Sequence, residues 1–336
     1  MDPLITTIIP TYRRPSMLRR AIRSALAQSW TALKVRVYDN AGDPENAAVI
    51  AGFDDPRLEY FRHANNLGAF ANFQFGLGRV NTPFFSFLAD DDILLPDFYA
   101  TAMAALEHEP TAAFAATRVV RVDGSGRMLA LDGAGLRSGS YRPPEGLLAL
   151  VEGGHINWVG ILFRRSALEH VPALDERTAP SFDLDFELRL AARSPFVVCE
   201  EPGALLVQHQ DSASVEARLS DTWPAFLQII DNATDGEKMP VAIRQRARAA
   251  MEHELAGRLY RIGRAAARQG RVIDAHAAAA LIAERYGWHR RAALVRVAAR
   301  ICAALPPTRS ALRLALEGYR QLRAAGSADY GTRLRS

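Results

Sequence analysis

Paired cysteines and long apolar runs are both missing from this sequence of 336 residues. Cys199 and Cys302 are far apart and have no CxxC or Cys/His spacing, so we expect two reduced core residues instead of a disulfide framework or zinc site. No run of about 20 uncharged apolar residues occurs, and the opening MDPLITTIIPTYRRP lacks the segments of a secretory signal. We therefore expect a cytoplasmic protein without a membrane span.

Glycine is absent from TYRRPS (11–16), the segment that follows the first apolar run. Dinucleotide oxidoreductases require GxGxxG at this place, and nucleotidyltransferases require a glycine-rich loop with a basic residue, so both classes fit poorly. The basic residues of the chain are not interleaved with aromatic side chains and form no known recognition motif. We therefore expect no nucleic-acid partner.

Charge is distributed unevenly along the chain. Residues 241–336 hold 19 arginines and 6 acidic residues, whereas the first 240 residues hold 22 basic and 31 acidic residues. This asymmetry predicts two regions with different tasks. We place the first at 1–218 and a basic, α-helical C-terminal region at 219–336.

The first hundred residues alternate between strand and helix patterns. β-Branched and aromatic runs predict buried strands, and apolar positions at helical spacing predict helices. This alternation with short connections predicts an α/β fold whose central sheet is mostly parallel and covered by helices on both faces. The expected strands are 4–10, 34–40, 57–63 and 84–89, with helices from Pro15, at 44–53, from Gly68 and from Pro96.

The later sequence is β-rich and turn-rich from about residue 112, and helical again after Asp221. We expect a strand entering a helix at 156–168, a helix at 181–193, and two short strands at 195–200 and 203–209. Breaks in the C-terminal helices are expected near Gly236, Gly270, Gly287 and Pro306.

Carboxylates follow two of the predicted parallel strands. Asp39 ends the strand at 34–40, and Asp90, Asp91 and Asp92 follow the strand at 84–89. Open α/β sheets bind ligands at the carboxyl ends of their strands, so both groups are expected to face one crevice. Three adjacent carboxylates repel one another and need a positive partner or an exposed strand end, and a divalent cation is one such partner.

The motifs IIPTYRRP, VYDNAGD, NNLGAF, FLADDDILLPDF, FRRSALEHVPALDE, FDLDFELRL and VQHQDSAS follow one another in a characteristic order. In this order they resemble the family 2 glycosyltransferases with the GT-A fold, over about residues 4–215. The resemblance implies a Rossmann-like catalytic domain at 1–218, with a nucleotide-binding half at 1–110 and an acceptor half at 111–218. It also implies inverting, metal-dependent sugar transfer from a nucleotide-diphosphate sugar, with UDP favoured, in polysaccharide or glycoconjugate biosynthesis. The acceptor would be a hydroxyl of a glycan or of a lipid-linked or other glycoconjugate.

The same resemblance assigns the DXD-type metal site to the triple aspartate. Asp91 would bind Mn²⁺ or Mg²⁺ directly, Asp90 the ribose hydroxyls or the metal, and Asp92 the metal or the donor sugar. His209 would complete the metal site from a later strand. The family more often has an acidic residue where Ala89 stands, so the division of roles among the three aspartates stays open.

Nucleotide contacts are implied on the first strand-to-helix turn and beyond it. Pro10, Thr11 and Arg13 would meet the base and phosphates, although Arg13 and Arg14 are also readable as solvent-exposed charges. Asp39 would accept a hydrogen bond from the base ring, with a helix cap for 44–53 as the alternative. In the motif NNLG, the backbone at Asn66 and Gly68 would approach the nucleotide closely.

Catalysis is implied for the helix at 181–193. Asp183 matches the family's catalytic aspartate and would be the general base, Asp185 is the second candidate, and Phe182 replaces the usual glutamate. His155 and Trp158 would contact the acceptor or the donor sugar. Because of Phe182, a non-catalytic binder of nucleotide sugars or glycans remains the alternative function.

The basic C-terminal region has three readings. Its helices mix leucine, valine and alanine with arginine, as at 291–305 and 311–323. Such helices pack on the catalytic domain, form a homodimer, or lie peripherally on the anionic inner face of a membrane.

Overall fold

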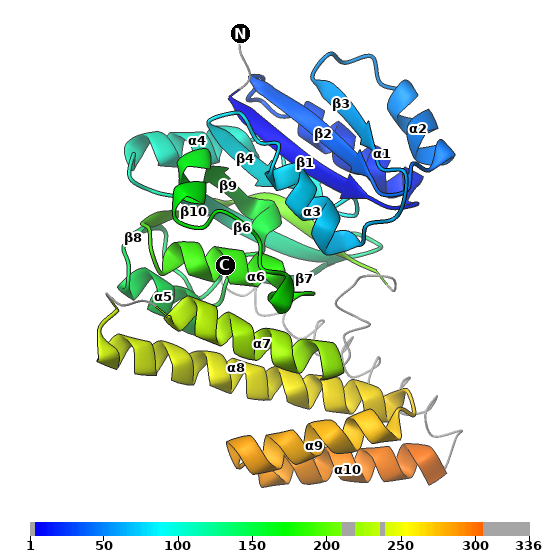
Figure 1. Ribbon diagram of the computed structural model, residues 1–336, viewed down its shortest axis with the longest axis vertical. Coiled ribbons are helices and arrows are strands. Elements are labelled where there is room, and N and C mark those ends of the chain that lie inside the picture. The colour runs from blue at the N-terminus through cyan, green and yellow to red at the C-terminus, as the bar shows by residue number, and fades with distance from the viewer. Residues whose placement is uncertain (1–3, 210–218, 236–238, 305–336) are drawn as a thin grey trace, which may run out of the picture. The chain divides into compact units, whose positions relative to one another are not determined.

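The computed structural model describes residues 4–209, 219–235 and 239–304 (Figure 1). The chain divides into two compact units. The first comprises Met1–Ser212 with Pro224–Ala250, and the second comprises Ala213–Trp223 with Met251–Ser336. The division falls inside two helices, α7 (Leu219–Thr234) and α8 (Val241–Arg268).

The first unit is built on a ten-stranded sheet in which eight strands follow the order β3-β2-β1-β4-β9-β6-β10-β5. The other two lie off this path, with β7 paired to β6 and β8 paired to β10. Strands β3, β2, β1 and β4 are parallel neighbours, and β9 then runs antiparallel to both β4 and β6. The expected α/β fold with a mostly parallel central sheet is confirmed, and the second half of the sheet also contains antiparallel pairs. The strands are β1 (Ile5–Thr11), β2 (Leu33–Asp39), β3 (Leu58–Arg62), β4 (Phe84–Phe87), β5 (Ile93–Leu94), β6 (Phe114–Asp123), β7 (Met128–Asp132), β8 (Gly139–Tyr141), β9 (Ile161–Arg164) and β10 (Phe196–Gln208).

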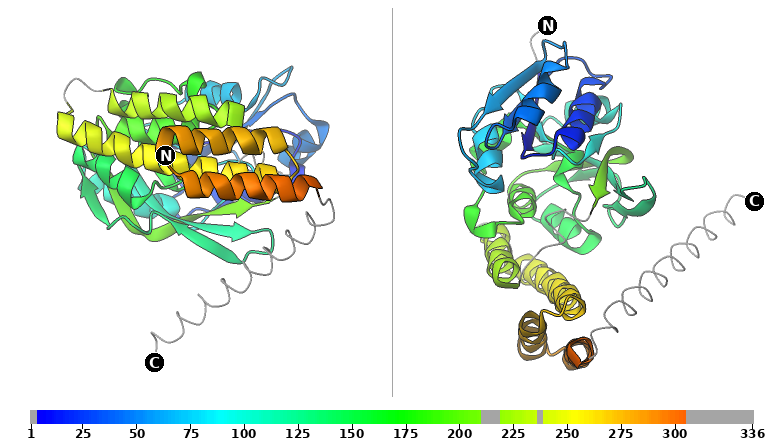
Figure 2. Two further views of the ribbon diagram at one scale, coloured as in Figure 1. Left: turned by 90° about the horizontal axis from the view of Figure 1, so that it is seen from below. Right: turned by 90° about the vertical axis from the view of Figure 1, so that its right-hand side faces the viewer.

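Helices cover both faces of the parallel strands, and every residue of β1 is therefore buried. Helix α1 (Pro15–Leu26) buries Leu18, Ala21, Ile22 and Ala25 against the sheet and also contacts α2 (Pro44–Ala51). Helix α3 (Ala69–Leu77) lies on the opposite face (Figures 1 and 2). It packs closely there, since a Cβ at Gly76 would lie 2.6 Å from Cγ2 of Ile8.

The remaining helices of this unit are α4 (Phe98–His108), α5 (Glu145–Gly153) and α6 (Phe182–Ala191). Helix α5 lies in the stretch that the sequence predicted to be turn-rich. The strand expected to enter a helix at 156–168 is instead the short strand β9 between two 3₁₀ turns, 158–160 and 165–169.

The two short strands expected at 195–200 and 203–209 are one strand, β10. Proline and glycine at 202–203 mark a bulge instead of a turn. The parallel pairing with β6 shifts register on both sides of Pro202 and then continues to Gln208.

The second unit is helical over the residues that the structure describes. Helix α8 ends at Arg268, α9 spans Val272–Tyr286, and α10 spans His289–Ala304 beside it (Figure 2). The expected breaks at Gly270 and Gly287 are present, and both glycines have positive φ angles of 74° and 66°. The helix expected at 311–323 lies outside the described residues. Among the helices that are described, none is both long and apolar enough to cross a membrane.

Candidate active site

The triple aspartate lies on the turn between β4 and β5, where the β4 chain leaves the sheet. Asp90 is buried, and its carboxylate accepts a hydrogen bond of 2.7 Å from the Thr11 hydroxyl at the end of β1. Its other oxygen lies 3.2 Å from Nη1 of Arg14. Burial, and next the neighbouring charge of Asp91, raise the pKa of Asp90 to about 6, although Thr11 and Arg14 oppose this shift.

Asp91 is half-buried and connects two strands' ends. One carboxylate oxygen, Oδ2, is 3.2 Å from Nη1 of Arg14 and 2.9 Å from Nε2 of His209, which directly follows β10. The structure therefore brings together Thr11, Asp90, Asp91 and His209 from the predicted set. These residues, with Arg14, are called the acidic turn site below.

Asp92 turns to the sheet. Its Oδ1 accepts a hydrogen bond of 3.1 Å from the backbone amide of Val207 on β10, and its side chain is buried. Burial and the charges of Asp91 and Asp90 raise its pKa well above the usual range. This contact joins the turn to β10, which directly precedes His209, so Asp92 has a structural role. The metal and donor-sugar roles expected of Asp92 stay predictions.

The side chains of the acidic turn site fit a divalent cation whose coordination is completed by oxygen atoms of a substrate. Among the described residues, no group of three or more histidine, cysteine or acidic side chains is arranged to enclose a metal ion. Asp91 and His209 supply one carboxylate and one imidazole within hydrogen-bond distance. Mg²⁺ is usually held by one or two carboxylates together with substrate phosphates, and imidazole is an accepted ligand of transition metals.

Asp39 lies at the end of β2, next to Thr11 at the end of β1. It is fully buried, and its oxygens accept hydrogen bonds of 3.2 Å from Asn46 and 2.6 Å from the Tyr60 hydroxyl. Burial, and next the bond to Asp39, raise the pKa of Tyr60. The alternative of a helix cap is wrong for Asp39, because Asp43 caps α2 through the amide of Glu45.

The NNLG turn is held by Asn40, a residue that sequence reasoning missed. Its Nδ2 donates to Oδ1 of Asn66 at 2.7 Å and to the carbonyl of Gly68 at 3.2 Å, and its Oδ1 accepts from the amide of Leu67 at 2.7 Å. Its own backbone amide donates to the carbonyl of Thr11. Asn40 therefore joins this exposed turn to the first two strands, and its place beside Asp39 at a strand end was the available signal.

Arg14, instead of Arg13, reaches the carboxylates. Pro10 and Thr11, expected on the turn, are the last two residues of β1, and the chain turns at Arg13, whose φ angle of 53° is left-handed. The Arg13 guanidinium lies 5.2 Å from the ring centre of Tyr12. Neighbouring side chains diverge at such a turn, and the sequence alone did not distinguish the two arginines.

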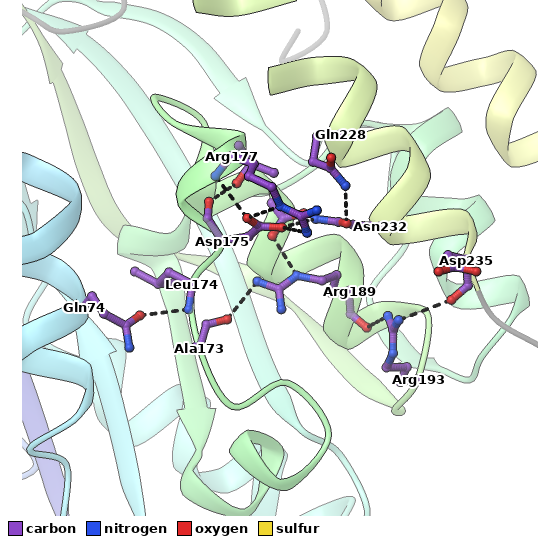
Figure 3. Close-up of polar contacts among 12 residues, drawn as sticks. Gln74, Ala173, Leu174, Asp175, Arg177, Arg189, Arg193, Gln228, Asn232 and Asp235 are labelled. Carbon is purple, nitrogen blue, oxygen red and sulfur yellow. Dashed lines mark hydrogen bonds and ion pairs between the residues drawn. The ribbon is translucent and has the colours of Figure 1, made fainter. Parts of the chain in front are cut away.

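Helix α6 carries both predicted catalytic candidates in its first turn. Asp183 is half-buried. Asp185 is fully buried, accepting from Nε of Arg189 at 2.7 Å and from Nδ2 of Asn232 on α7 at 2.8 Å. Figure 3 shows Arg189 and Asn232 among the polar contacts of this region. The Asp185 carboxylate therefore holds α6 against α7, and Asp183 is the more accessible member of the pair.

Glu187 is a further buried carboxylate, one helical turn after Asp183. Its Oε1 accepts a hydrogen bond of 3.3 Å from the amide of Ile156, and its exposed fraction is 2%. Burial above all raises its pKa well beyond the usual range, and Asp183 and Asp132 add to the shift. Glu187 therefore links α6 to the loop that carries half-buried His155.

Trp158 belongs to an aromatic cluster and is nearly buried. Its ring stacks on Phe87 with centres 4.2 Å apart, and it also contacts Phe73 and Phe182 at 4.9 and 5.7 Å. The cluster connects the start of α6 to the end of β4, from which the acidic turn follows. These contacts favour a packing role for Trp158 over direct sugar contact.

Residues 6–171 match the family model described as "Glycosyl transferase family 2". The chain belongs to glycosyl transferase family 2. Among curated relatives, the Campylobacter jejuni GalNAc(5)-diNAcBac-PP-undecaprenol beta-1,3-glucosyltransferase is 33% identical over 104 residues, which are 30% of this chain and 34% of that enzyme. The succinoglycan biosynthesis protein ExoO of Rhizobium meliloti is 30% identical over 95 residues, 28% of this chain and 27% of that protein. The matches thus span about a third or less of each of these two relatives.

Two solved structures share the fold of this family 2 member. Staphylococcus aureus TarS 1–349 in complex with UDP has a TM-score of 0.63 at 12% identity, covering 90% of this chain and 91% of that one. The Pyrobaculum calidifontis mannosyltransferase PcManGT in complex with GDP-Man and Mn²⁺ has a TM-score of 0.53 at 16% identity, covering 91% and 88%. At these identities the likeness establishes a GT-A-like fold.

Proposed function

We propose that this family 2 glycosyltransferase transfers a hexosyl group from a UDP-sugar to an acceptor hydroxyl, with inversion and with Mn²⁺ or Mg²⁺ at the acidic turn site. The observation that carries the proposal is the shared contact of Asp91 with Arg14 and His209. Two cationic or metal-ligating groups converge there on the most exposed of three adjacent carboxylates. Such a site is suited to bind the diphosphate of a nucleotide sugar.

The nucleotide would lie across the ends of β1, β2 and β4. Asp39 would face the base, and the turn held by Asn40 would place the Asn66–Gly68 backbone beside the nucleoside. Pro10, Thr11 and Asp90 would line the crevice between them. The choice of UDP is supported by TarS, a protein of the same fold that binds UDP and UDP-GlcNAc.

Asp91 and His209 would hold the divalent cation, and Asp90 and Asp92 would orient the turn around it. When bound, the cation neutralises negative charge that develops on the departing diphosphate. Arg14 lies where it adds positive charge to the same group, because it already contacts both Asp90 and Asp91. Use of a metal is supported by the Mn²⁺ complex of PcManGT.

Asp183 would act as the general base. Its carboxylate takes the proton of the acceptor hydroxyl while the hydroxyl oxygen attacks the anomeric carbon, and the bonding electrons leave with the phosphate oxygen. A single displacement of this kind inverts the anomeric configuration. His155, on the loop fastened by Glu187, is the side chain proposed to contact the sugars.

The acceptor class is proposed from the relatives' names. One relative is named as acting on an undecaprenol-linked glycan, and another as a succinoglycan biosynthesis protein. A glycan carried on a lipid or other glycoconjugate is therefore the proposed acceptor, and polysaccharide biosynthesis the proposed context.

The test measures ligand binding and turnover separately. Thermal shifts with UDP, GDP, CDP and dTDP, with and without Mn²⁺, identify the nucleotide, because a ligand that binds only the folded state raises the melting temperature. Release of nucleoside diphosphate from a panel of sugar nucleotides then measures turnover. We expect Asp91→Asn to lose the metal-dependent part of the shift, and Asp183→Asn to keep the shift while turnover falls at least ~100-fold.

A non-catalytic binder is the second candidate, favoured by one observation. Phe182, which stands where the family has a glutamate, is buried against Phe70, Phe73 and Trp158, so this position contributes packing in place of a carboxylate. A binder would show the nucleotide shift with Mn²⁺ and no turnover in the wild type. Equal turnover in the wild type and Asp183→Asn would instead exclude Asp183 as the base.

A further inference from the structure

Helix α10 exposes an apolar stripe on its outer side. Leu294, Val297 and Ile301 are 60%, 52% and 42% exposed. With 100° per residue, their spacing of three and four places them along one line of the helix. The side of α10 that is buried is formed by different residues, namely Ala292, Val295, Ala299 and Cys302.

Arginines surround this stripe. By the same helical rotation, exposed Arg290 continues the line at the N-terminal end, and exposed Arg291 and Arg300 flank it on either side. Helix α10 contains no aspartate or glutamate. Residues 251–304 hold four acidic residues, of which three pair with arginines of the same unit: Glu252 with Arg285, Glu254 with Arg261 and Asp274 with Arg271. The fourth, Glu284, is exposed on α9 and does not belong to the α10 face.

The charge of the surrounding chain limits what can cover the stripe. A second copy packed on the same face would set arginines against arginines without intervening carboxylates. Residues 305–336 hold six arginines and two acidic residues, so this segment has the same sign of charge. A complementary occupant must be anionic and must also accept three aliphatic side chains.

We propose that the stripe Leu294, Val297 and Ile301, with Arg290, Arg291 and Arg300, docks on an anionic lipid surface. Aliphatic side chains flanked by arginines match a bilayer interface, where the aliphatic groups enter the acyl boundary and the guanidinium groups contact phosphates. Nucleic acid offers no comparable apolar layer. Docking needs no nucleotide, so the inference is independent of the proposed reaction, although a lipid-linked acceptor would be found at the same surface.

The test is flotation of the full-length protein with vesicles of phosphatidylglycerol and phosphatidylcholine in equal parts, against vesicles of phosphatidylcholine alone. We expect binding to the anionic vesicles that salt weakens. The double variant Arg290→Gln/Arg300→Gln should bind roughly tenfold to thirtyfold more weakly. The triple variant Leu294→Gln/Val297→Gln/Ile301→Gln should lose at least about tenfold.

Matched control variants change similar side chains elsewhere. Met128→Gln/Leu129→Gln alters two exposed apolar residues of β7, and Arg20→Gln/Arg137→Gln removes two exposed charges. Both should bind as the wild type does. Circular dichroism of every variant ensures that a loss of binding is not a loss of folding.

Three results would overturn the proposal. The first is a wild type that floats with neither type of vesicle, or equally with both. The second is unchanged binding by the α10 variants. The third is a wild-type dimer in analytical ultracentrifugation that the triple variant converts to monomer, which would make the stripe a self-association surface. A nucleotide-binding protein that shows no turnover, by contrast, would affect only the proposed reaction.

Discussion

Asp183 and Glu187 are chemically similar residues, four positions apart on α6, with different surroundings. Asp183 is half-buried, whereas Glu187 is enclosed and receives one backbone hydrogen bond. Burial raises the pKa of Glu187, so its neutral form is favoured in the folded protein. A neutral Glu187 adds no negative charge beside Asp183, which suits a group that must be ionised to accept a proton.

The Glu187→Gln substitution tests this assignment through the pH dependence of stability. Because the pKa of Glu187 is raised above its ordinary 4.5, the folded state holds this proton more tightly than the unfolded state. The wild type therefore loses stability as pH rises from about 4.5 towards the folded pKa, by up to about 1.4 kcal/mol per pH unit. Glutamine accepts the same hydrogen bond and does not titrate, so the variant should be the more stable protein at pH 7 and equal to it near pH 4.

Urea unfolding at several pH values measures this difference. Exposed Glu169 provides the control, since Glu169→Gln should differ from the wild type by the same small amount at every pH. A Glu187→Gln curve parallel to that of the wild type would mean that Glu187 is ionised in the folded protein.

Single residues of the site differ in how well the sequence predicts them. The carboxylates Asp39 and Asp90 to Asp92 were found because they end strands whose apolar patterns are unambiguous. Arg14 was not selected, because the φ angle of Arg13 decides which arginine reaches Asp90 and Asp91. Burial of Glu187 depends on the loop at Ile156, which is 31 residues away in sequence and has no pattern that predicts its path.

At the scale of elements, the turn Asn65–Gly68 is exposed, yet hydrogen bonds from the Asn40 side chain hold its conformation. Gly68 directly precedes α3 and has a φ angle of 83°, and a Cβ added there would meet nothing within 4 Å. Backbone strain is therefore the cost of a side chain at this position, roughly 1–3 kcal/mol, because a φ of 83° with a ψ of 163° is a conformation that almost only glycine adopts. If the turn contacts the nucleotide, this strain should also weaken binding.

Gly68→Ala is accordingly expected to lower stability by roughly 1–3 kcal/mol and to weaken UDP binding several-fold. Gly126, on the turn between β6 and β7, has the same φ angle of 83° and the same open surroundings. Gly126→Ala should therefore also lose stability through backbone strain, while its UDP affinity, measured by calorimetric titration, stays that of the wild type. Equal affinities in both variants would remove the NNLG turn from the binding site.

Elements were predicted best where periodicity and burial agree. The four parallel strands and the helices between them follow this rule. Helix α5 was overlooked because Pro143 and Pro144 before it and the glycines around it indicate turns. Strand β10 was divided in two because Pro202 and Gly203 usually end a strand, whereas here they form an irregularity that β6 continues to pair across.

At the scale of the molecule, the two units have separate cores. Gly263 lies at a tight contact of the helical unit, where a Cβ would be 3.0 Å from Cγ1 of Val295 and 3.1 Å from Cβ of Ala278. Gly257, on the same helix, has only the flexible end of Arg261 nearby, at 3.6 Å. These two glycines provide a matched pair for separating the units thermodynamically.

Gly263→Val should destabilise the helical unit by roughly 1–3 kcal/mol through overpacking, whereas Gly257→Val should be neutral or slightly stabilising. Calorimetry with and without UDP and Mn²⁺ provides the readout. In the Gly263→Val variant we expect the melting temperature of one transition to fall. The other transition should still rise in melting temperature when UDP and Mn²⁺ are added. A single transition that falls equally in both variants would indicate that α7 and α8 couple the units into one cooperative structure.

The irregularity in β10 has a consequence for how this part of the chain can vary. Val198 and Ala204 are six residues apart and would share a face of a regular strand, but their partners on β6, Ala116 and Val119, are three apart and point to opposite faces. Strand β10 therefore has an odd number of extra residues here. As a result, each later side chain, including that of His209, points to the opposite face from the one that an unbroken strand would give it. Insertions or deletions in this stretch preserve the histidine's orientation only when they come in twos, so lengths drawn from related enzymes should differ here by even steps.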